Sequence, residues 1–309
     1  MRRILVAIVL AMLLVLTIGV AILWWLGGSG SGTQWLLRQA VQFSQGALMV
    51  EGTQGALSGP LHIAHLTFEN AALHADIQDL QLDWLPHLLG QRRVAVNYLR
   101  LGNLHLTLKD KEAKEEEPLT LPQGLVLPVG VEIHEVSIER LTITKGGTDH
   151  HLSGLNVRLN SDAAHHVLVL SAARTPIGAV RGEVQLGAAR PFPLQGTLDL
   201  SQTETSTPYQ VKTLLSGDLN RVGITATAEA QGAKAQVNTL VTPFDPVPFA
   251  QLEVQANALD PARLKPDAPR ADIALSLSAH TETESKVTGK MEIINTLPGN
   301  WDQKRLPLK

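Results

Sequence analysis

The chain of 309 residues contains no cysteine, and only 4% of its residues are aromatic. The absence of cysteine excludes disulfides, thiolate catalysis and thiolate-bound zinc or iron–sulfur sites. Because large rings are so few, any buried core must consist of Val, Leu, Ile and Ala. Charged residues make up 18% of the chain and the formal net charge is −3, so the basic stripe of a nucleic-acid-binding protein is missing. We therefore expect no nucleic acid among the partners.

The sequence also lacks the motifs of common enzymes. It has no G-x-S-x-G, H-E-x-x-H or G-x-x-x-x-G-K-[ST] motif, and no G-x-G-x-x-G after a strand. Two adjacent histidine pairs, His150-His151 and His165-His166, are the nearest approach to a metal site, with Asp149 and Asp162 close by. Adjacent residues of a strand point to opposite faces, so we favour solvent-exposed turn histidines over metal ligands. The sequence thus predicts no catalytic residue, no cofactor and no metal.

An uncharged run from Ile4 to Leu26 is the strongest single signal in the chain. As a helix with a rise of about 1.5 Å per residue it would span roughly 34 Å, slightly more than a hydrocarbon core. Arg2 and Arg3 precede the run, and Trp24 and Trp25 close it where indoles favour the headgroup layer. The alternative is a signal peptide, but its apolar region usually has only about 7–15 residues. We predict an uncleaved, single-pass anchor whose N-terminus is cytoplasmic.

Between this anchor (1–26) and the rest of the chain, residues 27–46 are predicted to form a tether and a short helix. Residues 27–32 (GGSGSG) form a flexible tether, and Thr33 is the predicted N-cap. Apolar residues then recur at helical spacing, namely Trp35, Leu36, Ala40, Val41 and Phe43. Such a helix either closes one end of a β-core or lies on the membrane surface, and we favour the first arrangement.

From Ala47 onward, apolar residues alternate with polar ones, which is the pattern of half-buried strands. Single histidines such as His62, His74 and His105 fall on the polar side of this alternation. Asp83 is predicted to cap one helical turn that ends at Gly90. Later units begin with glycine, as in Gly182–Leu186, Gly196–Leu200 and Gly289–Ile293. The whole pattern predicts a mainly β fold, an antiparallel meander of about sixteen strands with one apolar face.

Such a sheet must cover its apolar face, and helices are not available to do so. The remaining architectures are a two-sheet sandwich, a closed barrel, or a sheet curled into an elongated groove. The scarcity of aromatic residues favours the groove, although a dry sandwich explains the alternation equally well. The residues expected to line the groove are Val184, Leu186, Leu198, Leu200, Ile273, Leu275, Leu277, Met291 and Ile293.

The β-rich part is expected to extend over residues 47–309. It is interrupted by the charged segment 109–118 (KDKEAKEEEP), which ends in proline. Runs of charge of this kind are usually solvated, so we predict an exposed loop there rather than an acidic binding site.

Several segments carry a resemblance to a known family. They are Gly52-Thr-Gln-Gly55-Ala-Leu57-Ser-Gly59 behind the anchor, Leu73–Trp84, Leu99–Leu106, Val287–Asn295, and Leu297-Pro-Gly299-Asn-Trp301 with Leu306-Pro-Leu308. In this order, with the charged insertion, they resemble the N-terminal part of the TamB family and its AsmA-like relatives, bridge-type lipid-transfer proteins. The resemblance covers essentially the whole chain.

The resemblance implies a single-pass inner-membrane protein whose periplasmic part forms an apolar β-groove. It implies phospholipid as the cargo between the inner and outer membranes, and a TamA-type outer-membrane barrel as a partner in protein assembly. Members of the family are several times longer, and the C-terminal region expected to contact the barrel is absent here, so a truncated chain is expected. Two hypotheses follow: a lipid conduit, or a scaffold whose sheet edges recruit client strands.

Overall fold

The computed structural model describes residues 27–109, 120–162, 164–203, 207–264, 267–283 and 286–307. The predicted anchor Ile4–Leu26 lies outside these residues, as does the predicted charged loop apart from Lys109. Among the helices that are described, none has the length and hydropathy needed to cross a membrane.

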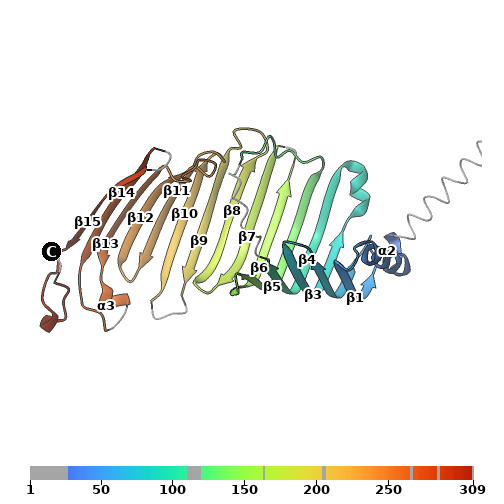
Figure 1. Ribbon diagram of the computed structural model, residues 1–309, viewed down its shortest axis with the longest axis horizontal. Helices are drawn as coiled ribbons and strands as arrows, with labels where there is room; N and C mark the ends of the chain where they lie inside the picture. The colour runs from blue at the N-terminus through green and yellow to red at the C-terminus, as the bar shows by residue number, and fades with distance from the viewer. Residues whose placement is uncertain are drawn as a thin grey trace, which may run out of the picture. The chain divides into compact units, whose positions relative to one another are not determined.

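The described chain is mainly β, with a few short helices (Figure 1). Its elements are α2 (Gly30–Phe43), β1 (Leu48–Gly55), β2 (Leu61–Glu69), β3 (Leu73–Trp84), η1 (Pro86–Gln91), β4 (Arg93–Leu108), β5 (Gly130–Lys145), β6 (Thr148–Ser161), β7 (His165–Thr175), β8 (Gly178–Gly187), β9 (Leu194–Gln202), β10 (Tyr209–Gly217), β11 (Val222–Ala230), β12 (Ala233–Val241), β13 (Gln251–Leu259), α3 (Pro261–Leu264), β14 (Ile273–Thr283), β15 (Lys286–Asn295) and η2 (Trp301–Gln303). The hydrogen-bonded order of this 15-stranded sheet follows the chain from β1 to β15. The predicted antiparallel meander is confirmed.

The chain divides into two compact units, which we describe separately. Unit 1 comprises Met1–Glu112 and Val131–Leu155, and so contains α2, β1 to β5 and the first part of β6. Unit 2 comprises Ala113–Gly130 and Asn156–Lys309, and contains the rest of β6 and β7 to β15.

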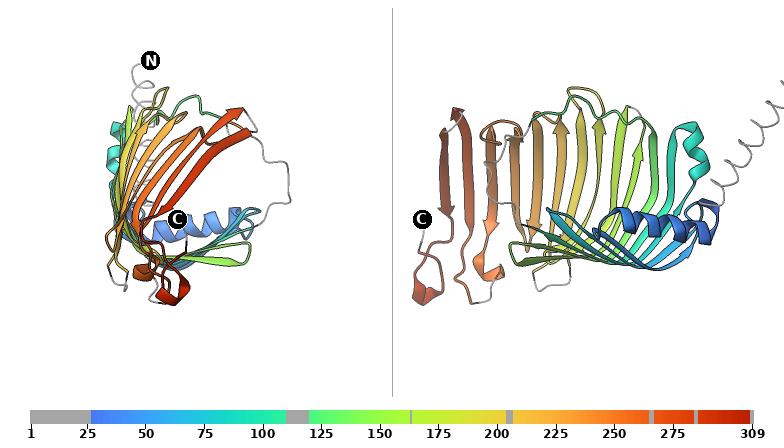
Figure 2. Two further views of the ribbon diagram at one scale, coloured as in Figure 1. Left: turned by 90° about the vertical axis from the view of Figure 1, so that its left-hand side faces the viewer. Right: turned by 45° about the vertical axis from the view of Figure 1, so that its right-hand side comes forward.

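Helix α2 lies on the inner side of the curved strands of unit 1 (Figure 2). Its N-cap is Ser29, whose hydroxyl accepts a hydrogen bond from the Gly32 N–H at 3.0 Å. The prediction that Thr33 is the N-cap was therefore wrong, because the Ser29 hydroxyl, four residues earlier, accepts the hydrogen bond from a free backbone N–H of the first helical turn. As a result, three residues assigned to the tether belong to the helix, and Thr33 is fully buried within it.

The core of unit 1 is small and aliphatic. Leu101 of β4 packs with Ile138 and Leu141 of β5, and all three side chains are buried. Half-buried aliphatic residues surround them, namely Ile77, Leu80, Leu99, Leu104, Leu106, Ile143, Leu152 and Leu155. Burial of a side chain of this size contributes about 1.5–3 kcal/mol, so lateral packing between neighbouring strands stabilises the unit without a second layer.

Two local expectations are corrected by the strands themselves. Asp83 lies in β3 and accepts a hydrogen bond from the side-chain amide of Asn97, so the short 3₁₀ helix begins only at Pro86, without a side-chain cap. Gly182, Gly196 and Gly289 lie inside β8, β9 and β15 rather than at strand starts, and backbone and side-chain atoms of the neighbouring strand occupy the space beside each of them. A Cβ at Gly182 would lie 2.6 Å from Leu198 Cδ2.

Candidate functional site

The two faces of unit 1 differ in chemistry, and the strand register shows how. Residues directly opposite each other on β2, β3 and β4 form cross-strand rows in which every member is apolar. These rows are Leu61–Leu82–Leu99, Ile63–Leu80–Leu101, Leu66–Ile77–Leu104 and Phe68–Ala75–Leu106. Simple alternation would place the last two rows on the other face, because Leu80 and Ile77 are three residues apart. The register skips Asp79 between them, and both side chains pack against the Leu101 cluster, so all four rows share one side, which we call the apolar face.

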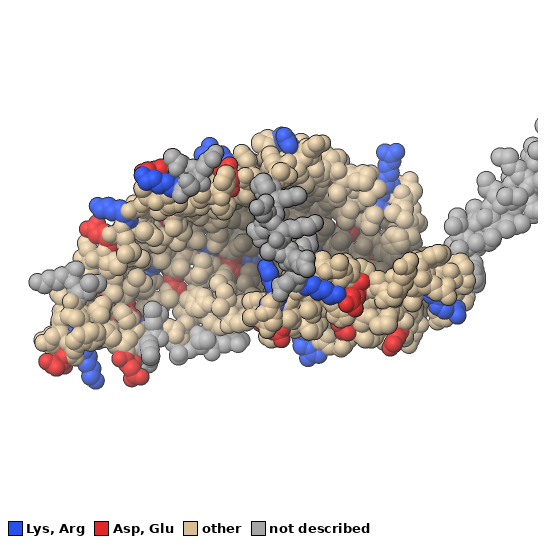
Figure 3. All heavy atoms as spheres, in the orientation of Figure 1, with Lys and Arg blue, Asp and Glu red and all other residues tan. Residues whose placement is uncertain are grey.

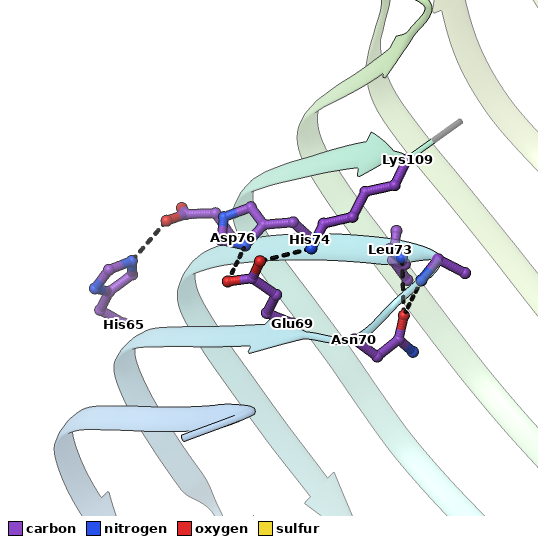
Figure 4. A network of polar contacts seen from close by, with 8 residues as sticks. His65, Glu69, Asn70, Leu73, His74, Asp76 and Lys109 are labelled. Carbon is purple, nitrogen blue, oxygen red and sulfur yellow. Dashed lines mark hydrogen bonds and ion pairs between the residues drawn. The ribbon is translucent and has the colours of Figure 1, made fainter. Parts of the chain in front are cut away.

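The opposite side of unit 1, the polar face, carries a network of hydrogen bonds and ion pairs. His65 contacts Asp76 at 2.8 Å, and Glu69 accepts a hydrogen bond from the Lys109 ammonium at 2.6 Å while His74 lies 3.8 Å away (Figure 4). Further links join β3, β4 and β5 to their neighbours, namely His62–Asp79, Gln78–Asn103, Asn103–Arg140, Arg100–Glu135 and His105–Thr144. The histidines predicted to lie on the polar side do so.

Carboxylates on the polar face are held in their charged form. The hydrogen bond from Lys109 and its positive charge lower the pKa of Glu69. The Arg100 guanidinium likewise lowers the pKa of Glu135, whose carboxylate in turn raises the pKa of Arg100. These groups are exposed to water, so each ion pair contributes little to stability while it keeps this face polar.

In unit 2 the register again separates two faces. One row of opposed residues runs from Leu198 through Thr213, Ala226, Val237, Val254 and Leu277 to Met291. The next runs from Leu200 through Val211, Ala228, Ala235, Ala256 and Leu275 to Ile293. Val184, Leu186 and Ile273 lie on the same side, since Val184 faces Gly196, Leu186 faces Leu194 and Ile273 is two residues before Leu275.

The strand register thus places all nine residues predicted to line a groove on one face, the apolar face of unit 2. Their polar neighbours lie on the other side, where Arg181 faces Asp199 and Ser276 faces Glu292. Gly182 lies opposite Leu198 and Gly196 opposite Val184, so that these two large side chains each have a glycine beside them.

Many side chains of the apolar faces remain accessible to solvent. Leu108 in unit 1 is 39% exposed, and in unit 2 Leu168 is 43% and Met291 63% exposed. In Figure 3 the hollowed parts of the visible surface are mostly tan, whereas Lys, Arg, Asp and Glu gather along their edges. A large apolar surface open to water is a common mark of a binding surface for apolar ligands or partners.

A crevice between α2 and β1 adjoins the first strand of the apolar face in unit 1. Leu37 and Val41 of the helix line one wall, and Val50 and Thr53 of β1 line the other. Val50 lies opposite Leu66, so the crevice continues directly into one of the apolar rows. We conclude that α2 closes the apolar face only partly at this strand.

Side chains far apart in sequence fix α2 beside the β1–β2 loop. The Thr33 hydroxyl accepts a hydrogen bond from the Leu57 N–H at 2.7 Å, and the Trp84 indole donates one to the Leu57 carbonyl at 2.5 Å. The Ser58 N–H also donates to the Gly27 carbonyl at 2.8 Å. No sequence motif marks these contacts, because each depends on the three-dimensional arrangement of the loop.

The adjacent histidine pairs are split between environments. His150 and His151 are exposed, as predicted, but they lie within β6 rather than in a turn, and His165 is exposed beside Asp162 at the start of β7. The prediction was wrong for His166, which is half-buried on the apolar face opposite Leu186. Its ring lies 2.5 Å from the Ser161 hydroxyl and 2.9 Å from the Leu125 carbonyl, which ties the segment before β5 to β7. Across the described residues, no cluster of His, Asp and Glu could hold a metal ion.

Comparison with known proteins identifies the N-terminal half of the chain. No curated protein and no solved structure matches the chain. Residues 19–169 match the family model described as the TamB N-terminal domain. This segment contains α2 and the strands β1 to β6, and so includes the apolar rows of unit 1. Residues 19–169 therefore belong to the TamB family as its N-terminal domain, which confirms the resemblance for this part of the chain, whereas the similar segments after Val287 lie outside the match.

Proposed function

We propose that the apolar face binds the acyl chains of phospholipids and conducts them between the inner and outer membranes. In this proposal Ile4–Leu26 anchors the chain in the inner membrane with a cytoplasmic N-terminus, and the β-rich part lies in the periplasm as a groove. The observation that carries the proposal is the run of apolar rows whose side chains remain open to water. Membership of residues 19–169 in the TamB family supports it.

The chemistry of the two faces suits an acyl chain better than a polar ligand. An acyl chain needs only non-directional contact with aliphatic surface, and the rows from Leu198 to Met291 and from Leu200 to Ile293 offer little else. The headgroup must stay hydrated, and the charged residues of Figure 3 lie along the edges where water reaches them. The proposed conduit requires no catalytic group.

Site-specific photo-crosslinking tests the proposal directly. A photoreactive amino acid at Leu277, on the apolar face, is expected to capture phospholipid in cells, which mass spectrometry of the purified chain would identify. The same amino acid at Ser278, which follows directly on β14 but points to the polar face, is the matched control and should capture none. Equal capture at both positions, or none at Leu277, would contradict the conduit.

A charge on the apolar face tests transport itself. Leu275→Asp and Met291→Arg place a charge beside the acyl chains, where its desolvation costs several kcal/mol. Both variants should accumulate as folded protein and yet lose lipid cross-linking at Leu277. If both variants fail to fold and the parent chain shows no lipid cross-link, the face is a dry packing surface and the proposal is wrong.

A scaffold for outer-membrane proteins is the second candidate, and the edge strand β15 favours it. Within the described residues β15 pairs with β14, and in this alternative a client strand would add to the sheet through backbone hydrogen bonds along the other side of β15. In this alternative the chain works with a TamA-type barrel, and a photoreactive group at Lys290 should capture an outer-membrane protein rather than phospholipid. Capture of protein at Lys290 without lipid at Leu277 would favour the scaffold over the conduit.

A further inference from the structure

Helix α2 presents two large aromatic side chains to solvent, Trp35 and Phe43, one on either side of the half-buried Gln39. Trp35, Gln39 and Phe43 are spaced four residues apart and therefore lie along one side of the helix. Trp35 is 44% exposed and Phe43 is 81% exposed. These two large aromatic side chains form an apolar surface that the rest of the described chain leaves uncovered.

The opposite side of α2 is the one that packs on the sheet. Leu37 and Val41 line the crevice toward β1, and at 3.6 residues per turn they lie about half a turn away from the row of Trp35 and Phe43. The buried Thr33 fixes the helix to the β1–β2 loop through its hydrogen bond to Leu57. The exposed row therefore cannot turn inward without breaking these contacts.

The length of chain before α2 limits where the exposed row can lie. The uncharged run ends at Leu26 and the helix begins at Gly30, so the intervening residues span at most about 14 Å when fully extended. The helix contains no acidic residue and one basic residue, Arg38, which suits the neighbourhood of lipid phosphates.

We propose that α2 lies in the headgroup layer of the membrane that Ile4–Leu26 spans, with Trp35 and Phe43 inserted at the boundary of the acyl chains. Indole rings favour this layer, and a helix with aromatic residues along one side is typical of interfacial binding. The inference rests on the proposed function, because Ile4–Leu26 must be the anchor. Since α2 is fixed beside β1, the first strand of the apolar face would then lie next to the bilayer, where a lipid enters.

The cysteine-free sequence allows a direct test with the full chain in phospholipid vesicles. A single cysteine introduced as Phe43→Cys is labelled with an environment-sensitive fluorophore, and the vesicles contain lipids with a quencher near the headgroup. Two controls carry the same label: Leu168→Cys on the apolar face of unit 2, and Leu214→Cys, which is 58% exposed on the polar face. The label at Phe43 should lose most of its emission, and both control labels should keep theirs.

Each other result overturns the inference. Unquenched emission at Phe43 would show that α2 stays in water. Equal quenching at Phe43 and Leu168 would show that lipid bound along the sheet, rather than the bilayer, covers the helix. Self-quenching that grows with the ratio of protein to lipid would show a second copy of the chain on this row. Lipid cross-linking at Leu277 and membrane fractionation of the full chain test the conduit and the anchor separately, so failure of the inference is distinguishable from failure of the proposed function.

Discussion

The side chain of Thr33 and the backbone of Leu57 are joined by a hydrogen bond of 2.7 Å between α2 and the β1–β2 loop. Thr33 is fully buried, and the Trp84 indole satisfies the carbonyl of the same Leu57. Both backbone groups of Leu57 are therefore held by side chains from distant elements. The placement of α2 beside β1 depends on this pair.

Thr33→Val should loosen the attachment of α2. Valine keeps the shape of the side chain but removes the acceptor, so the Leu57 N–H is left without its partner at a cost of about 1–3 kcal/mol. We expect faster hydrogen exchange at Leu57 and in the N-terminal half of α2. Gln39→Ala, at a half-buried position of the same helix that takes no part in these hydrogen bonds, is the control and should leave exchange unchanged. Unaltered protection of Leu57 in Thr33→Val would show that other contacts hold the helix.

A charge introduced at a buried position should lower the free energy of unfolding more than a charge introduced at an exposed position. Leu101→Asp buries a carboxylate among Ile138 and Leu141, and should lower the free energy of unfolding by several kcal/mol. Met291→Asp, at a position that is 63% exposed, should change it by less than about 1 kcal/mol. Chemical denaturation of both variants checks the contrast. Similar losses at the two positions would mean that the apolar face of unit 2 is covered in solution.

Gly182→Ala should destabilise β8 and β9. The added Cβ would lie 2.3 Å from the Thr197 carbonyl oxygen and 2.6 Å from Leu198 Cδ2, which forces the two strands apart. Overpacking of this kind costs about 1–3 kcal/mol, measurable as a lower denaturation midpoint. At Gly59 nothing lies within 4 Å of an added Cβ, so Gly59→Ala should be nearly neutral. A neutral Gly182→Ala would indicate that the strands are free to separate locally.

Lys109→Met should raise the pKa of Glu69. The Lys109 ammonium donates a hydrogen bond to Glu69 at 2.6 Å, and its loss removes the main cause of the lowered pKa. A carboxylate whose folded pKa is lowered stabilises the fold above its unfolded pKa. That stabilisation is lost as the pH falls through the folded pKa, which the hydrogen bond and charge of Lys109 hold below the ordinary value of a glutamate.

NMR titration of the Glu69 carboxyl carbon measures this shift. Lys212→Met, on the polar face of unit 2, is the control and should leave the Glu69 titration unchanged. An unchanged Glu69 pKa in Lys109→Met would contradict the pairing shown in Figure 4.

Local alternation was sufficient to predict the strands and, between the points where its phase changes, such as Asp79 in β3, the chemistry of their two faces. In β3, for example, Leu80 and Leu82 lie on the apolar face and Gln81 on the polar face, because the period of two is a property of each strand alone. The identity of the N-terminal domain was likewise accessible, since its segments lie in a recognisable order along the chain.

Features that depend on distant contacts were not accessible from the sequence. The burial of Thr33 depends on the loop that contains Leu57, and the half-burial of His166 depends on the carbonyl of Leu125, 41 residues away. Gly182 was misplaced at a strand start because the space beside it is set by Leu198 of the next strand. The alternation of apolar and polar residues also cannot show whether the apolar face is open to water, since that depends on whether another layer of the protein packs against it.

The order of the sheet has a consequence for how the protein is made. Every strand pairs with the segment that precedes or follows it in the chain, so no pairing waits for a distant strand to be synthesised. Contacts of low sequence separation form early, and a sheet built from them can begin at any hairpin and extend to the neighbouring strands. Each strand therefore has its pairing partner in the adjacent part of the chain.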